Sequence, residues 1–323
     1  MGEGEFEKIA RLAARFRSVG AAGVLRGIGD DAAVLDGSVG GKLVWTIDEQ
    51  VEGTHFRRDL VGWADVGFRS FMAAASDVAA MGARPWCALS ALALPSDLED
   101  DALDALADGQ RLAADRIGAV LVGGNLARAQ AVSIATTLLG TCDRPVAREG
   151  GVAGDRVWIA GEVGLAGAGL MALVRGAKDR RLRPAVAAWQ RPVARTEAGL
   201  AMGKVAHAGI DVSDGLAQDA GHLARASGVC VVIDEERLLA HGGAALAGAA
   251  AALGVGPAEL ALHGGEDYAL VALSAEAIPG FVEIGEVREG EGVVLRGRAG
   301  ETALEGGGFD HFGRVPPGRP GSL

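Results

Sequence analysis

The feature that most constrains this chain is a set of carboxylates that stand at glycine turns and at the ends of short apolar runs. Asp48 ends the run Thr46-Ile47-Asp48, and Asp211 lies between Ile210 and Val212. The full set is Asp30, Asp31, Asp48, Asp77, Asp211, Asp214 and the pair Glu266-Asp267. An ionised carboxylate is costly to bury without a partner or a metal ion. The fold must therefore provide such partners at the ends of its strands.

The chain is long enough for one large or two ordinary domains. Its 323 residues are 49% hydrophobic, which is ample for a sizeable core and argues against disorder. Acidic residues outnumber basic ones by 42 to 31, giving a formal charge of -11, so a duplex nucleic acid is not expected as a partner. For the same reason, an anionic substrate would require metal ions.

The cysteines and the N-terminus favour a cytoplasmic protein. Cys87, Cys142 and Cys230 are widely separated and form no CxxC pair, so neither a disulfide framework nor a zinc site is expected. The first residues carry acids where a signal peptide has a basic region. The uncharged run 238–258 is long enough to span a bilayer, but it is mostly Ala and Gly and contains Pro257. We expect a packed helix and loop there, and no association with a membrane.

Hydrophobic periodicity predicts an α/β (α+β) chain of two domains. In the first half, we expect helices over 6–16, 61–81 and 98–118 and strands over 32–35, 42–47, 87–94, 119–122 and 133–139. In the second half, we expect strands over 156–160, 229–233 and 268–273, one more ending at Asp211, and helices over 165–174, 195–204 and 216–226. The stretch 145–155 is rich in Gly and Pro and is the predicted linker. The predicted domains are therefore 1–144 and 145–323.

Asp77 stands alone in the alanine-rich helix predicted over 61–81. It lies on the side of the helix opposite Phe68, since successive residues turn by about 100°. No cation lies four residues away to form an ion pair with it. Two interpretations stay open, a residue on a solvated helix face and a functional carboxylate.

The usual nucleotide-binding motifs are absent. A lysine follows Gly203, but Val205 stands where a phosphate-binding loop needs Ser or Thr, and the glycines over 161–169 do not fall as GxGxxG. For these glycines we expect close packing rather than a phosphate site. The basic segment 178–183 is expected to form a solvated face, and no Ser/His/Asp triad can be inferred from spacing.

The carboxylate set favours a magnesium site. Carboxylates are hard oxygen ligands, and one or two of them hold each magnesium ion together with water and substrate phosphates. Taken singly, Asp48 can end a strand, and Ser213 and Asp214 can cap a helix. Their apolar flanks favour ligands for several ions instead. His55 and Arg148 are candidate phosphate contacts, although a lone histidine is more often structural.

Short segments in a characteristic order resemble those of the thiamine-monophosphate kinase family. They are GEFEKIARL, GIGDDAAVL, TIDEQVEGTHF, SDVAAMGARP, GGN, RPVAR, DVSDGLAQDAGHLA, GGEDYALV and GFDHFG. The match covers nearly the whole chain. The same superfamily contains aminoimidazole ribonucleotide synthetase, selenophosphate synthetase and a hydrogenase maturation protein.

The resemblance implies a two-domain, aminoimidazole ribonucleotide synthetase-like fold. The N-terminal domains of two chains would form a β-barrel across a homodimer, and the C-terminal half would be an α/β domain. The resemblance also implies ATP-dependent phosphorylation of thiamine monophosphate to thiamine diphosphate by direct in-line transfer. Several Mg2+ ions would take part, with ATP as the co-substrate.

The resemblance also assigns roles to particular residues. The implied metal ligands are Asp31, Thr46, the backbone of Ile47, Asp48, Asp77, Asn125, Asp211 and Asp214. The implied ATP contacts are Gly124, Asn125, Arg148 and Ser213, and the implied thiamine monophosphate contacts are His55, Glu266 and Phe309. The implied catalytic residues are Asp31, Asp48, Asp77 and Asp211.

Three positions depart from the family pattern. The motif Gly-Gly-Asp-Thr-Thr-Arg reads Gly-Gly-Asn-Leu-Ala-Arg here, with Asn125 in place of a magnesium-binding aspartate. We expect one ion to bind more weakly as a result. Ile47 replaces a threonine, and Ala107 stands where an aromatic residue is frequent, so we expect a different adenine pocket.

Two other functions stay open. The chain could be another ATP-using member of the superfamily, acting on a different substrate. Against this, it lacks the reactive N-terminal cysteine of selenophosphate synthetase and the C-terminal cysteine of the carbamoyl-dehydrating protein, and it has His55 where aminoimidazole ribonucleotide synthetase has a lysine. The chain could also be a non-catalytic nucleotide-binding relative, an alternative that Asn125 supports.

Overall fold

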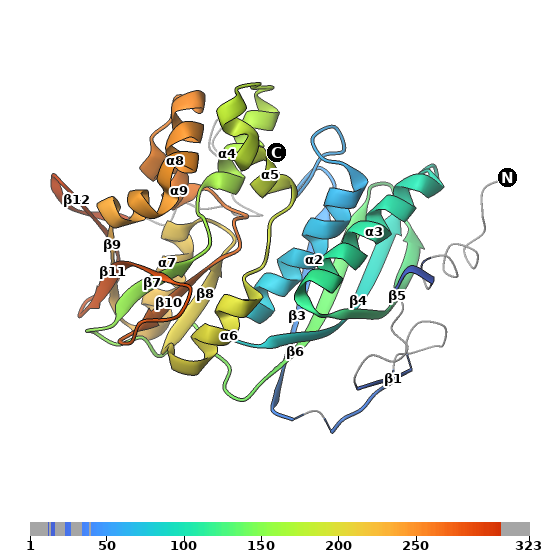
Figure 1. Cartoon of the computed structure of the whole chain (residues 1–323), viewed down its shortest axis with the longest axis horizontal. Coiled ribbons are helices and arrows are strands. Elements are labelled where there is room, and N and C mark those ends of the chain that lie inside the picture. Colours follow the sequence, from blue (N-terminus) through green and yellow to red (C-terminus); the bar gives the residue numbers. More distant parts are fainter. Residues whose placement is uncertain (1–11, 13, 17–22, 27–33, 39, 305–323) are drawn as a thin grey trace. The chain divides into compact units, whose positions relative to one another are not determined.

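The computed structural model describes residues 12, 14–16, 23–26, 34–38 and 40–304 (Figure 1). They form two compact units. The first contains the described residues up to Val78 and Ala83–Asp143, and the second contains Ala79–Gly82 and the described residues from Arg144 onward. Most of the helix predicted over 6–16, together with Asp31 and Phe309, lies outside the described residues.

Four strands form the main sheet of the first unit. They are β3 (Lys42–Val51), β4 (Arg84–Leu94), β5 (Val120–Arg128) and β6 (Ser133–Cys142), in the spatial order β3-β6-β4-β5. β6 pairs antiparallel with both β3 and β4, whereas β4 and β5 are parallel. A separate antiparallel pair joins β1 (Val24–Arg26) to β2 (Val34–Leu35). Strands are therefore found at every apolar run predicted to form one in this half.

β5 is longer than the sequence indicates. Its predicted end at Val122 is wrong, because the strand continues through Gly124 and Asn125 to Arg128. A Cβ atom on Gly124 would lie 2.0 Å from the carbonyl oxygen of Ser90 on β4, so glycine permits a close approach of the two strands. The glycine serves packing between strands here, and it does not end the strand.

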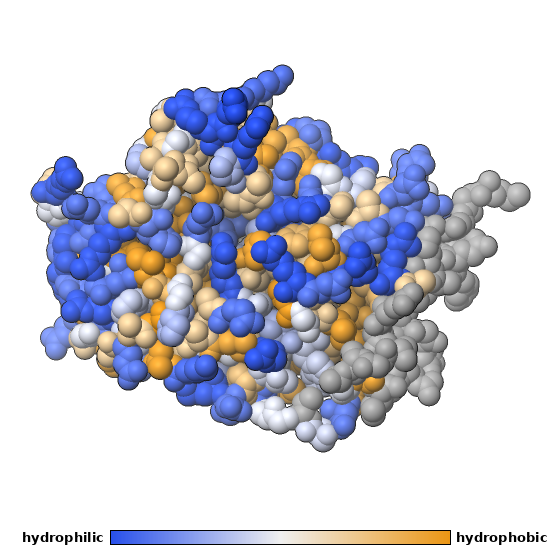
Figure 2. Space-filling view, viewed as in Figure 1, coloured by the Kyte–Doolittle hydropathy of each residue, from blue (hydrophilic) through white to orange (hydrophobic). Residues whose placement is uncertain are grey.

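Two helices cover one face of this sheet (Figure 1). α2 (Trp63–Ala80) and α3 (Asp100–Ile117) confirm both predicted helices. The helices approach closely at two glycines: a Cβ atom on Gly67 would lie 1.9 Å from the carbonyl oxygen of Leu106, and one on Gly109 would lie 1.9 Å from that of Ala64. Hydrophilic side chains gather over α3 on the face shown in Figure 2.

The opposite face of the sheet carries exposed apolar side chains. Side chains alternate along β3, and Leu43, Trp45 and Ile47 are 58%, 72% and 64% exposed. Leu89 of β4, in the same cross-strand row as Ile47, is also exposed. We call these four residues the outer face. Thr46 and Asp48 alternate with them and point to the helix-covered side.

The second unit is built on a seven-stranded sheet in the spatial order β13-β12-β9-β11-β7-β10-β8. The strands are β7 (Arg156–Ala160), β8 (Ala208–Val212), β9 (Cys230–Asp234), β10 (Ala269–Ser274), β11 (Val282–Arg288), β12 (Gly292–Gly297) and β13 (Gly300–Leu304). Neighbouring strands are antiparallel, except that β9 and β12 are parallel. β7, β8, β9 and β10 confirm the strands predicted in this half.

Six α-helices pack on this sheet within the described residues. They are α4 (Leu165–Val174), α5 (Arg183–Gln190), α6 (Thr196–Val205), α7 (Leu216–Ser227), α8 (Glu235–Leu253) and α9 (Pro257–His263). α4, α6 and α7 confirm predicted helices, whereas α5 and α9 are additional. The basic segment 178–183 exposes its lysine and arginines to solvent, as predicted.

β11, β12 and β13 are missing from the sequence prediction. Several of their side chains are charged and pair across the strands: Arg288 lies 2.9 Å from Glu301, and Arg296 lies 2.5 Å from Glu286. Such strands contain no long apolar run, because ion pairs take the place of apolar contacts on one face. Apolar runs alone therefore cannot reveal them.

α8 occupies the uncharged run predicted to be a packed helix and loop. Leu238, Leu246 and Leu253 of this helix are buried in the core of the second unit, which confirms the packed helix. No single described helix is long and apolar enough to cross a membrane, and α8 and α9 reach that length only as a pair bent by 107°.

Replacing Gly67 by alanine is expected to destabilise the first unit, because the new Cβ atom would overlap the carbonyl oxygen of Leu106. Overpacking of this kind costs about 1–3 kcal/mol of unfolding free energy. The matched control is Gly248→Ala in α8, where a Cβ atom would lie 3.7 Å from Arg181. The control should be neutral or stabilising by up to about 1 kcal/mol. Urea unfolding measures both variants, and equal stabilities would contradict the close helix contact.

Candidate functional site

In the second unit, Asp211, Ser213 and Asp214 lie together at the end of β8. Asp211 is 6% exposed and pairs with Leu270 of the neighbouring strand β10. Gly215 then adopts a φ of 116°, a backbone conformation that glycine takes without strain, and α7 begins at the next residue. The strand therefore delivers three oxygen-bearing side chains directly before a helix.

Asp219 lies in the first turn of α7, and its buried side chain stabilises the turn between β8 and α7. Its Oδ2 atom accepts hydrogen bonds from the backbone N–H groups of Ser213 and Asp214, at 3.0 and 3.1 Å. Burial, together with the charges of Asp214 and Asp211, raises the pKa of the Asp219 carboxyl to about 8. The sequence patterns considered above do not single out this residue. The available signal is an acid in the first turn of a helix that directly follows a functional turn.

Glu266 lies beside the same turn. Its backbone N–H donates to the carbonyl oxygen of Ser213 at 2.8 Å, and that of Tyr268 donates to Val212 at 2.9 Å. Glu266 and Tyr268 have φ angles of 65° and 49°, which are uncommon for residues with a side chain and store strain. The indole N–H of Trp189 donates to the Glu266 carboxylate at 2.7 Å. A carboxylate implied to contact thiamine monophosphate is therefore held next to a serine implied to contact ATP.

Asp267, between these two strained residues, is buried and caps α4. Its carboxylate oxygens accept hydrogen bonds from the backbone N–H groups of Gly164 and Ala166, at 2.6 and 2.8 Å. A Cβ atom on Gly169 would lie 2.1 Å from the carbonyl oxygen of Ala185, so this glycine permits α4 and α5 to approach. The glycines over 161–169 therefore serve close packing, as predicted, and a protein carboxylate fills the helix N-terminus.

Arg148 is exposed, and its charge and that of Asp214 both affect the pKa of His222. Burial, followed by the charges of Arg225 and Arg148, lowers the pKa of His222, whereas Asp214 raises it. The Arg225 Nη2 atom lies 2.8 Å from His222 Nδ1. Two arginines thus place positive charge near the acidic turn, where it can attract phosphates.

In the first unit, the structure brings Thr46, Asp48 and Asp77 to the helix-covered side of β3. The Thr46 hydroxyl donates a hydrogen bond to the Asp77 carboxylate of α2 at 2.6 Å. Asp48, two residues along the strand, accepts a hydrogen bond from Gln50 Nε2 at 3.2 Å. Asp77 is half-buried and bonded to a strand, so it does not lie on a solvated helix face. Ile47 points its side chain the other way, which leaves only its backbone for a ligand role.

The oxygen atoms around Asp48 fit a magnesium ion. Gln50 Oε1 and Thr136 Oγ1 are buried without a hydrogen-bond partner among the described residues, and Thr136 lies directly opposite Asp48 on β6. The described part of the chain has no group of three or more His, Cys, Asp or Glu side chains able to hold a metal. Magnesium does not require one, because phosphates and water complete its shell around one or two carboxylates.

His55 follows β3, and two hydrogen bonds with the backbone of Val51 fix its position. The N–H of Val51 donates to His55 Nδ1 at 3.0 Å, and the N–H of His55 donates to the carbonyl oxygen of Val51 at 2.8 Å. Because Nδ1 accepts a hydrogen bond, the ring proton is assigned to Nε2. The Nε2–H group is the one that can donate to a phosphate.

Gly124 and Asn125 lie on β5, at the opposite edge of the sheet from β3. Three interstrand spacings separate these edges, which places Asn125 roughly 14 Å from Asp48. The register sets Asn125 opposite Ala91, an exposed residue, whereas Thr46 faces the helices. Within one chain, Asn125 therefore does not lie with Thr46 and Asp48.

A pocket of about 150 Å³ opens beside Gly124 and Asn125. Its other lining residues are mostly apolar, with the side-chain amide of Gln110 among them. Ala107, where an aromatic residue is frequent in the family, is fully buried in α3 and does not line this pocket.

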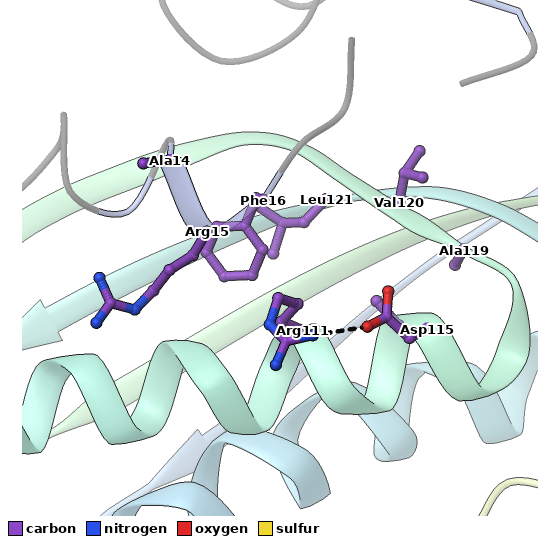
Figure 3. Close-up of a pocket in the computed structure, with 9 residues that line it drawn as sticks. Ala14, Arg15, Phe16, Arg111, Asp115, Ala119, Val120 and Leu121 are labelled. Carbon is purple, nitrogen blue, oxygen red and sulfur yellow. Dashed lines mark hydrogen bonds and ion pairs between the residues drawn. The ribbon is translucent and has the colours of Figure 1, made fainter. Parts of the chain in front are cut away.

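A larger pocket of about 410 Å³ in the first unit lies next to α3 (Figure 3). Phe16 and Leu121 line it, and Arg111 pairs with Asp115 across one turn of α3 at 2.9 Å. None of the predicted site residues that the structure describes lines this pocket. Its size alone therefore does not make it the functional site.

Comparisons with known proteins agree with these observations. Residues 29–142 match the family described as AIR synthase related protein, N-terminal domain. The thiamine-monophosphate kinase of Mycobacterium tuberculosis (strain CDC 1551 / Oshkosh) is 38% identical over 324 residues, covering 99% of this chain and 94% of that protein. The thiamine-monophosphate kinase of Aquifex aeolicus (strain VF5) is 35% identical over 293 residues, covering 88% and 92%.

Solved structures show the same fold. AaThiL complexed with AMPPCP and TMP matches with a TM-score of 0.78 at 35% identity, covering 84% of this chain and 87% of that one. Thiamine-monophosphate kinase from Stenotrophomonas maltophilia K279a matches with a TM-score of 0.79 at 31% identity, covering 93% and 98%. Hydrogenase maturation protein HypE in complex with ATP, at 19% identity and a TM-score of 0.77, shares the fold alone. The predicted α/β, aminoimidazole ribonucleotide synthetase-like fold is confirmed.

Asp267 is expected to make the stability of the protein fall as pH rises. Burial is the largest cause that raises the pKa of its carboxyl to about 7, and Glu266 and Glu162 add to it, against the two N–H donors. Between about pH 4 and pH 7, the folded chain therefore holds a proton that the unfolded chain has released. The free energy of unfolding should fall by up to about 1.4 kcal/mol per pH unit across this window and then level off.

The variant Asp267→Asn lacks this titration and loses one hydrogen bond. It should be less stable than the natural protein, and the difference should shrink as pH rises from about 5 to 7. Urea unfolding of both proteins at several pH values measures it. A difference that stays constant with pH would contradict the raised pKa.

Proposed function

Because the chain belongs to the thiamine-monophosphate kinase family, we propose that it transfers the γ-phosphoryl group of ATP to thiamine monophosphate, giving thiamine diphosphate and ADP. The observation that carries the proposal is the backbone hydrogen bond from Glu266 to Ser213. It joins a carboxylate implied to contact thiamine monophosphate to a turn implied to contact ATP and magnesium. AaThiL, at 35% identity, was solved with AMPPCP and TMP together.

The proposed reaction is a direct in-line transfer. An oxygen of the substrate phosphate forms the new bond to the γ-phosphorus, while the bond from that phosphorus to the β–γ bridging oxygen breaks and ADP leaves with the electron pair. A phosphate monoester has a second pKa of about 6, so the attacking oxygen is largely ionised at neutral pH. The chain therefore has to hold two anions in line, and it does not have to supply a nucleophile or a strong base.

The chain's own groups bind and orient the two reactants. Bound magnesium would neutralise the charge on the transferring phosphoryl group. The proposed ligands are Asp31, Thr46, the backbone of Ile47, Asp48, Asp77 and Asn125 in the first unit, and Asp211 and Asp214 in the second. His55 donates from Nε2 to the substrate phosphate, and Arg148 and Ser213 hold phosphates of ATP. Glu266, fixed by Trp189, and Phe309 hold the thiamine part of the substrate.

We further propose that two chains pair through the outer face to form a β-barrel. Trp45 and Ile47 are more than half exposed, and large exposed apolar patches mark interfaces in soluble proteins. Burying such a surface gains about 25 cal/mol per Å². Asn125 faces the same side of the sheet, so the second chain would cover it. That chain would then supply the other magnesium ligands beside Asn125.

Phosphorus NMR of the purified protein with ATP, MgCl2 and thiamine monophosphate tests the proposed function. We expect the two phosphorus resonances of thiamine diphosphate to grow in step with those of ADP. Unphosphorylated thiamine is the matched control and should give no product, because the acceptor is a phosphate oxygen. ATP that stays intact, or is hydrolysed without a diphosphate product, would contradict the proposal and favour a non-catalytic relative.

The variant Asn125→Asp is expected to lower the magnesium concentration needed for half-maximal activity by roughly three- to tenfold, because affinity rises with the charge of the ligands. Asn125→Ala, which removes the amide oxygen, should raise this concentration. Magnesium titrations of the initial rate measure both effects. If neither variant changes the magnesium dependence, Asn125 is not a ligand.

The variant Trp45→Glu is expected to convert the dimer to a monomer, because the interface would then bury an unpaired charge. Leu112→Glu is the matched control, since Leu112 is a similarly exposed apolar residue of α3. Size-exclusion chromatography with light scattering measures the mass of each variant. A dimer that survives Trp45→Glu would rule out the outer face as its interface.

A further inference from the structure

The turn after β8 contains a buried carboxylate for which the proposed reaction has no use. Asp219 Oδ2 accepts hydrogen bonds from two consecutive backbone N–H groups, those of Ser213 at 3.0 Å and Asp214 at 3.1 Å. Two consecutive N–H groups that point to one spot form a concavity that binds anions. In this chain, the carboxyl group of Asp219 occupies that concavity.

We propose that Asp219 is a positioning residue, which presents the Ser213 hydroxyl and the Asp214 carboxylate together to a magnesium-bound nucleotide. This inference rests on the proposed function, which assigns Ser213 to ATP and Asp214 to magnesium. Asp219 does not touch the reactants. It is 2% exposed, and its Oδ2 atom is directed at the backbone of the turn.

The helix that carries Asp219 gives the carboxylate a fixed location. Leu216, Ala220 and Leu223 of α7 are fully buried in the core of the second unit. The N–H of Asp219 donates to the carbonyl oxygen of Gly215 at 3.0 Å, which closes the first turn of the helix. One side chain therefore connects an irregular turn to an element that cannot move without repacking the core.

Asp219 also decides which charge the turn attracts. With its carboxylate in the concavity, the N–H groups of Ser213 and Asp214 are not available to a phosphate. Asp211 and Asp214 instead place two carboxylates at the same turn, beside the carboxyl group of Asp219. Such a turn binds phosphates through a cation, so the same carboxylate that shapes the turn also makes it dependent on magnesium.

A purely structural role for Asp219 predicts a different outcome from a positioning role. A structural residue would lower the stability of the protein without changing the affinity for metal or nucleotide. Removing a residue that hydrogen-bonds to metal ligands and orients them typically lowers metal affinity by about 10–100-fold. The two roles are therefore separated by binding measurements on folded protein.

The experiment compares Asp219→Ala, Asp219→Asn and a matched control, Asp155→Asn, in the full chain. Asp155 is another buried aspartate of the second unit, and it accepts a backbone N–H from Val152 at 3.0 Å. It precedes β7 at the end paired with Ser274, whereas Asp211 pairs with Leu270 near the other end of β10. Asp155 thus tests the effect of losing a buried carboxylate away from the turn.

Three quantities are measured: amide hydrogen exchange of the segment 211–219, Mn2+ binding in the presence of ADP by electron paramagnetic resonance, and the KM values for ATP and thiamine monophosphate. In Asp219→Ala, we expect faster exchange at Ser213 and Asp214 and an Mn2+ dissociation constant raised by about tenfold or more. The KM for ATP should rise while that for thiamine monophosphate changes less than about twofold. Asp219→Asn, which keeps one acceptor oxygen, should show smaller effects.

Asp155→Asn should lose stability but keep the exchange of the turn and the Mn2+ affinity of the natural protein. Unchanged exchange and Mn2+ affinity in the Asp219 variants would overturn the inference, and so would equal changes in Asp219→Asn and Asp155→Asn. If Asp219→Ala does not fold, Asp219→Asn decides by the same readouts. Exchange and Mn2+ binding need no turnover, so a protein inactive on thiamine monophosphate would refute the proposed function and still test the role of Asp219.

Discussion

Buried carboxyl groups that accept backbone N–H groups hold two turns of the second unit in place. Asp219 accepts two such bonds from the turn after β8, and Asp267 accepts two from the start of α4. Each carboxylate would be costly to bury alone, and each N–H group would lack a partner without it. Because each satisfies the other, the chain can keep Glu266 and Tyr268 in strained backbone conformations beside Ser213.

The same contacts bear on how a chain with a formal charge of -11 would bind the anionic reactants proposed for it. Consecutive N–H groups and helix N-termini are the usual phosphate sites of a protein. Here, Asp219 and Asp267 fill two of these places. In the proposed function, Asp211 and Asp214 would bind phosphates through magnesium instead. The acidic composition and the proposed dependence on magnesium thus have one origin.

Sequence patterns predicted the elements with apolar periodicity and missed those without it. α2 and α3 bury one face and were predicted, whereas β11–β13 depend on ion pairs such as that of Arg288 with Glu301. In the site, apolar flanks predicted that the carboxylate of Asp211 would be buried. The role of Asp219 was not predicted, because its hydrogen-bond partners lie five and six residues earlier in the chain and contact it only once α7 has formed. The place of Asn125 at the far sheet edge depends on strand order, which no local pattern contains.

In the proposed reaction, the chain holds two phosphate groups in line, and no covalent intermediate forms. The most direct test uses ATP made chiral at the γ-phosphorus by isotopic and sulfur substitution, with thiamine monophosphate as the acceptor. The configuration of the transferred group in thiamine diphosphate is then determined. A single in-line displacement predicts inversion at phosphorus. Retention would indicate two successive displacements through a phosphorylated side chain, and it would contradict the account.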